Sequence, residues 1–381
     1  MVQCGAPRGG FYGGDERAER IQMIDAAVVG FGLGGRAFHA PIIHAVPGLR
    51  LAAIVQRHGK EAQEIYPDAK IVRDLDELLA MRSISLIAIA TPNETHFPFA
   101  KKCLETGRHV VVDKPFTTTL AEARELVEIA RRKDRVLTVY QERRCDGDFR
   151  TVQELLAKGS LGKVVRFESA FDRCRPQVRT DSWKEQPKPG GGVFFDLAPH
   201  LVDQTLQLFG PPESLLADIR IERENSRTAD AFDLTFYYTD ALRAILAQSM
   251  LAPDPRPHYR MQGTRGVYVK HALDPQEALL RAGHPVGGDD WGVEPEKDWG
   301  TMTLWSGGDF AHQKVPTLRG DYRDFYAQVR DAILGSAKPP VTTEEALQLM
   351  YTIELCEESS RKRMTLPWKF EATASLAGNA R

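Results

Sequence analysis

Short apolar runs alternate with helical segments through the first half of the chain, and this alternation constrains the fold more than any other feature. The runs lie at residues 26–29, 51–55, 70–72, 85–90, 110–112 and 136–140. Most of them are apolar at every position, not at alternate positions, which is typical of strands covered on both faces of a sheet. We therefore expect a doubly wound parallel α/β sheet over residues 24–142.

The second half of the chain has a different pattern. Longer runs with partial alternation lie at residues 163–171, 216–223, 232–238 and 242–250. Short turns such as Thr239-Asp240 join consecutive runs, which indicates antiparallel pairing. Because helical segments are few here, we expect an α+β domain over residues 143–381, with helices on one face of a large, mostly antiparallel sheet. The other face then needs cover, which predicts a homodimer or homotetramer formed through this sheet.

Length, charge and cysteine usage narrow the class of protein. The 381 residues exceed what one core usually organises. A net charge of −2 gives no electrostatic reason to expect nucleic acid or a membrane as partner, and no run is long and apolar enough to span a bilayer. Five scattered cysteines without a CxxC pair indicate reduced thiols in a cytoplasmic setting. Residues 1–23, rich in Gly and Arg, predict a disordered extension and not a secretory signal.

A glycine run follows the first predicted strand directly and precedes a helix. Gly30, Gly32 and Gly35 have the spacing of the dinucleotide-binding fingerprint, with Leu33 inside the same turn. Glycines allow the tight turn and let backbone N–H groups approach a pyrophosphate at a helix N-terminus. This context predicts a Rossmann domain that binds a dinucleotide; the alternative is a glycine-rich turn without a ligand.

The end of the second predicted strand indicates which dinucleotide binds. An acidic residue about twenty positions after the glycines would hold the adenosine ribose of NAD. This chain has Gln56, Arg57 and His58 there, and no carboxylate before Glu61. Because a guanidinium can pair with a ribose 2′-phosphate, we predict NADP, with NAD as the alternative. A solvated basic loop would explain the same residues.

Polar residues also follow two further strands, at the edge where open α/β sheets bind ligands. Thr91, Asn93 and His96 follow the fourth run, where they could line the cofactor; alternatively, Asn93 only caps the helix. Asp113 and Lys114 end the fifth run, and a proline fixes the turn after them. We predict that these five residues contact the cofactor. Lys114 could also hold a substrate oxygen and stabilise charge on it, although a solvated strand end is the simpler alternative.

Asp196 and His200 lie four positions apart in a predicted helix, so both project from one face. A histidine has a pKa suited to moving a hydroxyl proton, and a neighbouring carboxylate can orient it. Taken alone, the spacing is equally explained by two ordinary residues of one helix, with a histidine whose hydrogen bonds are made within the protein. Together with Lys114 it predicts a site for hydride transfer at a carbinol carbon. No cluster has the spacing of metal ligands, so no metal is expected.

These segments resemble the Gfo/Idh/MocA oxidoreductases. The glycine run, Thr-Pro-Asn-x-x-His at residues 91–96, Asp-Lys-Pro at 113–115 and Asp-x-x-x-His at 196–200 carry the likeness, which runs from Ile24 to the C-terminal helix. Family members typically read Glu-Lys-Pro, so Asp113 departs from the pattern while the lysine is kept. The resemblance implies that Lys114, Asp196 and His200 are the catalytic trio and that the Lys–Pro bond is cis.

A narrower likeness, at residues 140–146, 173–176 and 196–205, is to the NADP-dependent scyllo-inositol dehydrogenases. Cys145 stands where that group carries Trp, and Cys174 where a tyrosine is expected, which leaves the exact polyol open. The likeness implies hydride transfer on a cyclic polyol or sugar, first of all scyllo-inositol or scyllo-inosose. Arg144 and Arg173 are the predicted substrate contacts, with surface arginines as the alternative. Two other activities occur in such relatives: NAD-dependent glycosidases, and regulators that sense sugar or dinucleotide without chemistry.

Overall fold

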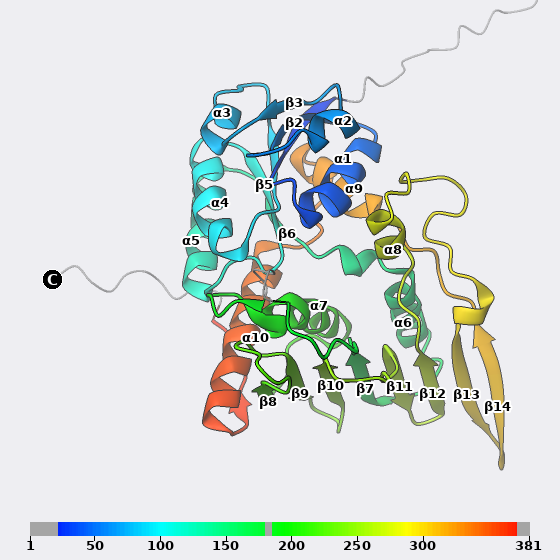
Figure 1. Cartoon of the computed structure of the whole chain (residues 1–381). Helices are drawn as coiled ribbons and strands as arrows, with labels where there is room; N and C mark the ends of the chain where they lie inside the picture. Colours follow the sequence, from blue (N-terminus) through cyan, green and yellow to red (C-terminus); the bar gives the residue numbers. More distant parts are fainter. Residues whose placement is uncertain (1–21, 180–184, 372–381) are drawn as a thin grey trace, which may run out of the picture.

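The computed structural model describes residues 22–179 and 185–371, and in this range the chain forms two β-sheets with helices packed around them (Figure 1). The smaller sheet occupies the upper part of Figure 1 and the larger sheet the lower part. The extension predicted for residues 1–23 lies outside the described range apart from its last two residues.

The smaller sheet has six parallel strands in the order β3-β2-β1-β4-β5-β6. The strands are β1 Ile24–Val29, β2 Leu49–Val55, β3 Lys70–Val72, β4 Leu86–Ile89, β5 His109–Asp113 and β6 Leu137–Tyr140. This is the strand order of a doubly wound dinucleotide-binding sheet, so the Rossmann prediction is confirmed. Every residue of β4 and the three valines of β5 are buried, which explains why these runs lack polar positions.

Helices cover both faces of this sheet. They are η1 Gly34–His39, a π-helix continued by α1 Ala40–Ala45, then α2 Glu61–Ile65, α3 Leu75–Leu79, η2 Asn93–Thr95, α4 His96–Glu105 and α5 Leu120–Lys133. α4 and α5 pack together on one side of the sheet, and α1 lies on the other (Figure 1). Because all six strands are parallel, the segments that follow β1, β2, β4 and β5 meet at one edge.

The larger sheet has nine strands in the order β14-β13-β12-β11-β7-β10-β9-β8-β15. Its strands are β7 Val164–Ala170, β8 Ser214–Arg220, β9 Ala231–Tyr237, β10 Arg243–Ser249, β11 Tyr259–Gly263, β12 Gly266–Lys270, β13 Gly300–Ser306, β14 Asp309–Val315 and β15 Leu366–Pro367. Of the neighbouring pairs, β7 and β10 run parallel and the others antiparallel. The prediction of a mostly antiparallel sheet is therefore confirmed.

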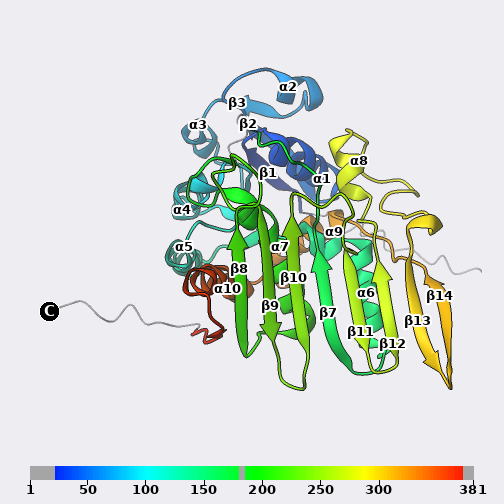
Figure 2. The same ribbon diagram turned by 60° about the horizontal axis from the view of Figure 1, so that its bottom comes forward.

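Helices α6 Gly147–Ala157, α7 Gly192–Phe209 and α10 Thr343–Lys362 pack on one face of this sheet, between it and the Rossmann sheet. Figure 2, turned so that the bottom of the molecule comes forward, shows strands β7 to β14 in front with these helices behind them. The remaining short elements are η3 Glu142–Cys145, α8 Gln276–Arg281 and η5 Glu296–Asp298. The predicted arrangement, with helices on one face, is confirmed.

The two halves of the chain do not separate completely at residue 142, because later segments also pack into the core of the first half. The hydrophobic core around the Rossmann sheet also contains Phe325, Tyr326 and Val329 from α9 (Arg323–Ile333), together with Ala346 and Met350 from α10. The chain therefore returns to the first core after building the second sheet. Figure 1 shows α9 beside α1, far from its sequence neighbours in β13 and β14.

Candidate active site

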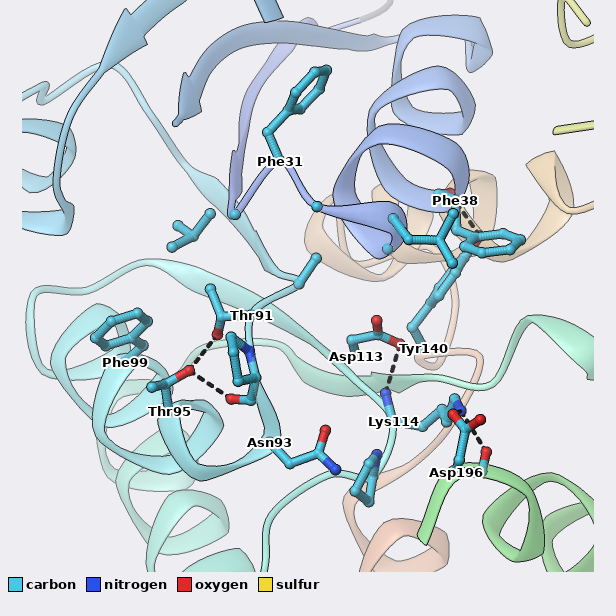
Figure 3. Close-up of a pocket in the computed structure, with 18 of the residues that line it drawn as sticks. Phe31, Phe38, Thr91, Asn93, Thr95, Phe99, Asp113, Lys114, Tyr140 and Asp196 are labelled. Carbon is cyan, nitrogen blue, oxygen red and sulfur yellow. Dashed lines mark hydrogen bonds and ion pairs between the residues drawn. The ribbon is translucent and has the colours of Figure 1, made fainter. Parts of the chain in front are cut away.

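A cleft of about 720 Å³ lies at the edge where the strands of the Rossmann sheet end, and it continues to α7. Open α/β sheets bind their ligands at this place. Figure 3 shows side chains from the ends of β4 and β5 on one side of the cleft and Asp196 of α7 facing them. The cleft therefore brings together residues that are far apart in the sequence.

The glycine run forms one end of the cleft, and two of its glycines are required by close backbone packing. Gly30 has φ of 97°, and a Cβ there would lie 2.6 Å from the Ala90 carbonyl oxygen. A Cβ at Gly35 would lie 1.9 Å from the Gly30 oxygen. A Cβ at Gly32 would meet no atom within 4 Å, because it would point into open space. Gly30, Gly32 and Leu33 line the cleft, whereas Gly35 does not. This geometry fits a dinucleotide whose pyrophosphate lies against the loop.

Basic side chains lie beside the end of β2. Arg57 and His58 are exposed and line the cleft, as does Arg73 after β3. The Arg73 guanidinium donates hydrogen bonds to the backbone oxygens of Gln56 (2.9 Å) and Gly59 (3.1 Å) and so stabilises the loop that carries Arg57. The Gln56 side chain is buried and contacts Glu61 and the Ala62 N–H. Arg73 was not predicted as a site residue from the sequence, but the parallel pairing of β2 and β3 places it here.

The residues after β4 have three different roles. Thr91 lines the cleft, and its Oγ1 accepts a hydrogen bond from Thr95 at 2.6 Å (Figure 3). Asn93 also lines the cleft, and its Nδ2 donates to the Gly190 oxygen at 2.7 Å, so it links the two halves and does not cap the helix. His96 departs from the prediction, because it is fully buried and does not line the cleft. Its ring nitrogens lie 2.8 Å from the Pro115 oxygen and 2.9 Å from the Thr91 oxygen, which fixes the two loops relative to each other.

The predicted catalytic residues lie together. Lys114 Nζ donates to the backbone oxygen of Asp196 at 2.6 Å and to its Oδ1 at 3.0 Å (Figure 3). Asp196 and His200 both line the cleft from α7, which places them on one helix face as their spacing predicts. The Lys114–Pro115 bond is cis, as the resemblance implies. A cation, a carboxylate and an imidazole from two domains thus share one cleft.

Of the two arginines predicted to contact the substrate, the structure places only one in the cleft. Arg173 lines the cleft, where burial lowers the pKa of its guanidinium. Arg144 does not line the cleft: its guanidinium binds Asp203 at 2.6 and 2.8 Å and the Pro340 oxygen at 2.9 Å. Its neighbour Arg143 lines the cleft instead and pairs with Glu277. We therefore assign Arg144 a structural role, since its hydrogen-bonding capacity is used within the protein.

Glu142 lines the cleft next to these residues and was missed by the sequence analysis. Its pKa is raised to about 7, mainly by burial; the Asp113 charge acts in the same direction, and the Arg143 and Lys114 charges partly oppose it. Its Oε2 atom is buried without a hydrogen-bond partner among the described residues. A carboxyl group in this environment keeps its proton near neutral pH, because ionisation would leave a charged oxygen buried.

Stability measurements can test this environment. In the unfolded chain Glu142 ionises near its ordinary pKa of 4.5, but in the folded chain only near 7. The folded state thus holds an extra proton between these values, so the free energy of unfolding falls as the pH rises through this window. We expect Glu142→Gln to match the parent near about pH 4 and to be more stable by on the order of 3 kcal/mol at about pH 8. Urea unfolding at both pH values checks this, with exposed Glu125→Gln as control; an equal difference at both would refute the raised pKa.

Known proteins share both halves of this architecture. Residues 24–141 match the oxidoreductase family with an NAD-binding Rossmann fold, and residues 149–269 match the Gfo/Idh/MocA C-terminal domain. The chain is 43% identical over 343 residues to the uncharacterized oxidoreductase YdgJ of Escherichia coli, an alignment that covers 90% of this chain and 98% of YdgJ. The chain belongs to the Gfo/Idh/MocA oxidoreductase family. The family prediction is therefore confirmed, and with it the prediction of an NAD(P)-binding oxidoreductase.

Two further relatives of this Gfo/Idh/MocA protein are informative. The NADP(+)-dependent scyllo-inositol 2-dehydrogenase IolW of Bacillus subtilis is 33% identical over 347 residues, which cover 91% of this chain and 96% of IolW. The solved structure of YPO2259 from Yersinia pestis superposes with a TM-score of 0.87 at 41% identity, covering 92% of this chain and 98% of that chain. The likeness in sequence and fold thus extends through both domains.

The described residues, 22–179 and 185–371, contain neither a metal-binding cluster nor a membrane-spanning helix. In these ranges no three His, Cys, Asp or Glu side chains are grouped so that they could hold a metal ion. In the same part of the chain, no helix has the length and apolar character needed to cross a membrane.

Proposed function

We propose that this oxidoreductase transfers hydride reversibly between NADP(H) and a hydroxyl or ketone carbon of a cyclic polyol or sugar, with scyllo-inositol and scyllo-inosose as the first candidates. The observation that carries the proposal is the contact between Lys114 and Asp196, 3.0 Å apart across the two domains, in a cleft that begins at the glycine loop. The 33% identity to IolW supports the polyol assignment.

The proposed roles follow from the chemistry of each side chain. The nicotinamide ring accepts or supplies the hydride when the cofactor is bound. His200 takes the proton of the reacting hydroxyl as its carbon becomes a ketone, and returns it in the reverse direction. Asp196 orients the reacting groups and holds Lys114, whose ammonium group stabilises the negative charge that develops on the substrate oxygen.

The two departures from the inositol dehydrogenase pattern lie away from the cleft. Cys145 is buried in η3, where burial raises its thiol pKa to about 12, and it does not line the cleft. Cys174 is exposed and forms an isolated backbone bridge with Leu251. Because neither side chain reaches the cleft, neither departure argues against a polyol substrate.

Arg57 supports NADP as the cofactor, because it lies on the cleft wall just after β2, with Arg73 nearby and no acidic residue in the ribose-binding position. Replacing Arg57 with Ala is expected to lower kcat/KM with NADP by about 10- to 100-fold, the worth of hydrogen bonds to a charged phosphate. Activity with NAD should stay within a few-fold of the parent. Steady-state kinetics with both cofactors checks this, and an equal loss with both would argue against a role in phosphate recognition.

We further propose that the protein self-associates through the uncovered face of its nine-stranded sheet (Figure 2). Half-buried side chains such as Thr235, Ile245 and Val267 alternate with buried core residues along these strands and therefore face away from the helices. Analytical ultracentrifugation distinguishes a dimer or tetramer from a monomer.

The absence of disulfides among the described cysteines supports a cytoplasmic location as part of the same proposal.

A further inference from the structure

His39 is a fully buried histidine to which none of the roles above has been given. It lies in η1, directly after the glycine loop, and its ring packs against Tyr140 with centroids 4.3 Å apart. Its Nδ1 lies 2.6 Å from the hydroxyl of Tyr326, which α9 brings from the far end of the chain. Its Nε2 lies 3.7 Å from Asp113 Oδ2 and has no hydrogen-bond partner among the described residues.

These contacts determine which ring nitrogen carries the proton. A neutral imidazole has one N–H donor and one acceptor nitrogen. If Nδ1 carried the proton, the lone pair of Nε2 would face the Asp113 carboxylate, and the Tyr326 hydroxyl would have no acceptor among the described residues. If Tyr326 donates to Nδ1 instead, Nε2 carries the proton and points it at the carboxylate. The second arrangement gives the Tyr326 proton an acceptor and turns the Nε2 proton towards the carboxylate.

Asp113 connects this pair to the reacting end of the cleft. Its Oδ1 accepts a hydrogen bond from the Lys114 backbone N–H at 2.8 Å (Figure 3). Its Oδ2 lies 2.9 Å from where a Cβ of Gly34 would be, so the glycine loop leaves room for this carboxylate. Asp113 therefore lies between the cofactor loop and Lys114, and His39 is directly behind it.

We propose that His39 is a positioning residue: through Nε2–H it fixes the Asp113 carboxylate, and through Asp113 it fixes the backbone of Lys114. Tyr326 holds the imidazole in the required tautomer, which gives the returning helix α9 a direct role at the site. The gap of 3.7 Å is longer than a hydrogen bond, and such contacts commonly tighten when a ligand fills the site. The inference rests on the proposed function, because it concerns the placement of Lys114 for hydride transfer.

Two substitutions separate this role from simple packing. His39→Asn places an amide oxygen near the Nδ1 position, so it keeps an acceptor for Tyr326 but removes the donor facing Asp113. His39→Gln places an amide nitrogen near the Nε2 position and keeps that donor. We expect His39→Gln to retain kcat within about threefold and His39→Asn to lose about tenfold or more, with KM changed little, because misplacement of a reacting group lowers the rate of the chemical step. If His39 only supported the packing, the loss of kcat in each variant would instead increase with the fall in its melting temperature.

The mutant cycle with Asp113 completes the test. In an Asp113→Asn background, His39→Asn should cause no further loss of kcat, since the carboxylate that His39 positions is absent. Melting temperatures and the Kd for NADPH, measured by fluorescence, should be similar for the two His39 variants. Additive losses in the cycle, or equal kcat for the two variants, would overturn the inference. If the parent protein turned over no polyol or sugar at all, the proposed function would fail, and with it the role of His39 in placing Lys114 for hydride transfer.

Discussion

Lys114→Ala is expected to lower kcat/KM by about 100- to 1,000-fold, the usual cost of removing one group that stabilises charge developing in the transition state. The Lys114 side chain is mostly buried, with 13% of its surface exposed, and it reaches across the cleft to Asp196. Its ammonium group is therefore held in the cleft between the two domains, where it can contact a substrate oxygen. The loss should be mainly in kcat, because the charge on that oxygen is larger in the transition state than in the bound substrate.

Steady-state kinetics in both directions measures this effect, and the Kd for NADPH reports whether cofactor binding survives. Lys101→Ala is the matched control, because Lys101 is an exposed lysine on α4 that pairs with Glu125 outside the cleft. Activity of Lys114→Ala within a few-fold of the parent would show that the lysine is not part of the catalytic machinery. A loss of cofactor binding without a change in kcat would assign it to the cofactor instead.

Gly32→Ala is expected to weaken NADP(H) binding by about 100-fold or more without unfolding the protein. The Cβ would meet nothing within 4 Å in the protein itself, so the melting temperature should not change. It would, however, occupy the space through which the backbone approaches the pyrophosphate, which is the reason for a glycine at this position of the fingerprint.

Gly35→Ala gives the contrasting result. Its Cβ would lie 1.9 Å from the Gly30 oxygen, so the loop has to move and the fold loses about 1–3 kcal/mol. Fluorescence titration with NADPH and thermal unfolding separate the two effects. If Gly32→Ala bound the cofactor as the parent does, the pyrophosphate would not lie against this loop.

The sequence predicts the elements whose signals are local. Unbroken apolar runs define the parallel strands, and the four-residue spacing of Asp196 and His200 places both side chains on the cleft side of α7. Lys114 is predicted for the same reason, because a charge directly after a buried strand lies at the edge where all parallel strands end. These features depend on period and position alone, so no tertiary information is needed to find them.

Features that depend on tertiary packing were not predicted. Of two adjacent arginines, Arg143 lines the cleft and Arg144 faces Asp203, because η3 turns between them in a way that no periodicity indicates. Tyr326 reaches His39 across 287 positions of sequence, since α9 returns to the first core. His96 looks like a cleft residue by position, but it is buried because two backbone carbonyls surround its ring.

Nicotinamide absorbance reports whether the Lys114 cleft carries out net hydride transfer between NADP and a polyol. Parent protein and Lys114→Ala are assayed against a panel of inositols, inososes and aldoses, with NADP and NAD side by side. We predict reduction of NADP by at least one cyclic polyol, faster than reduction of NAD and lost in Lys114→Ala. No net absorbance change with any member of the panel, whether glycosides are hydrolysed instead or the dinucleotide only binds, would contradict the claim.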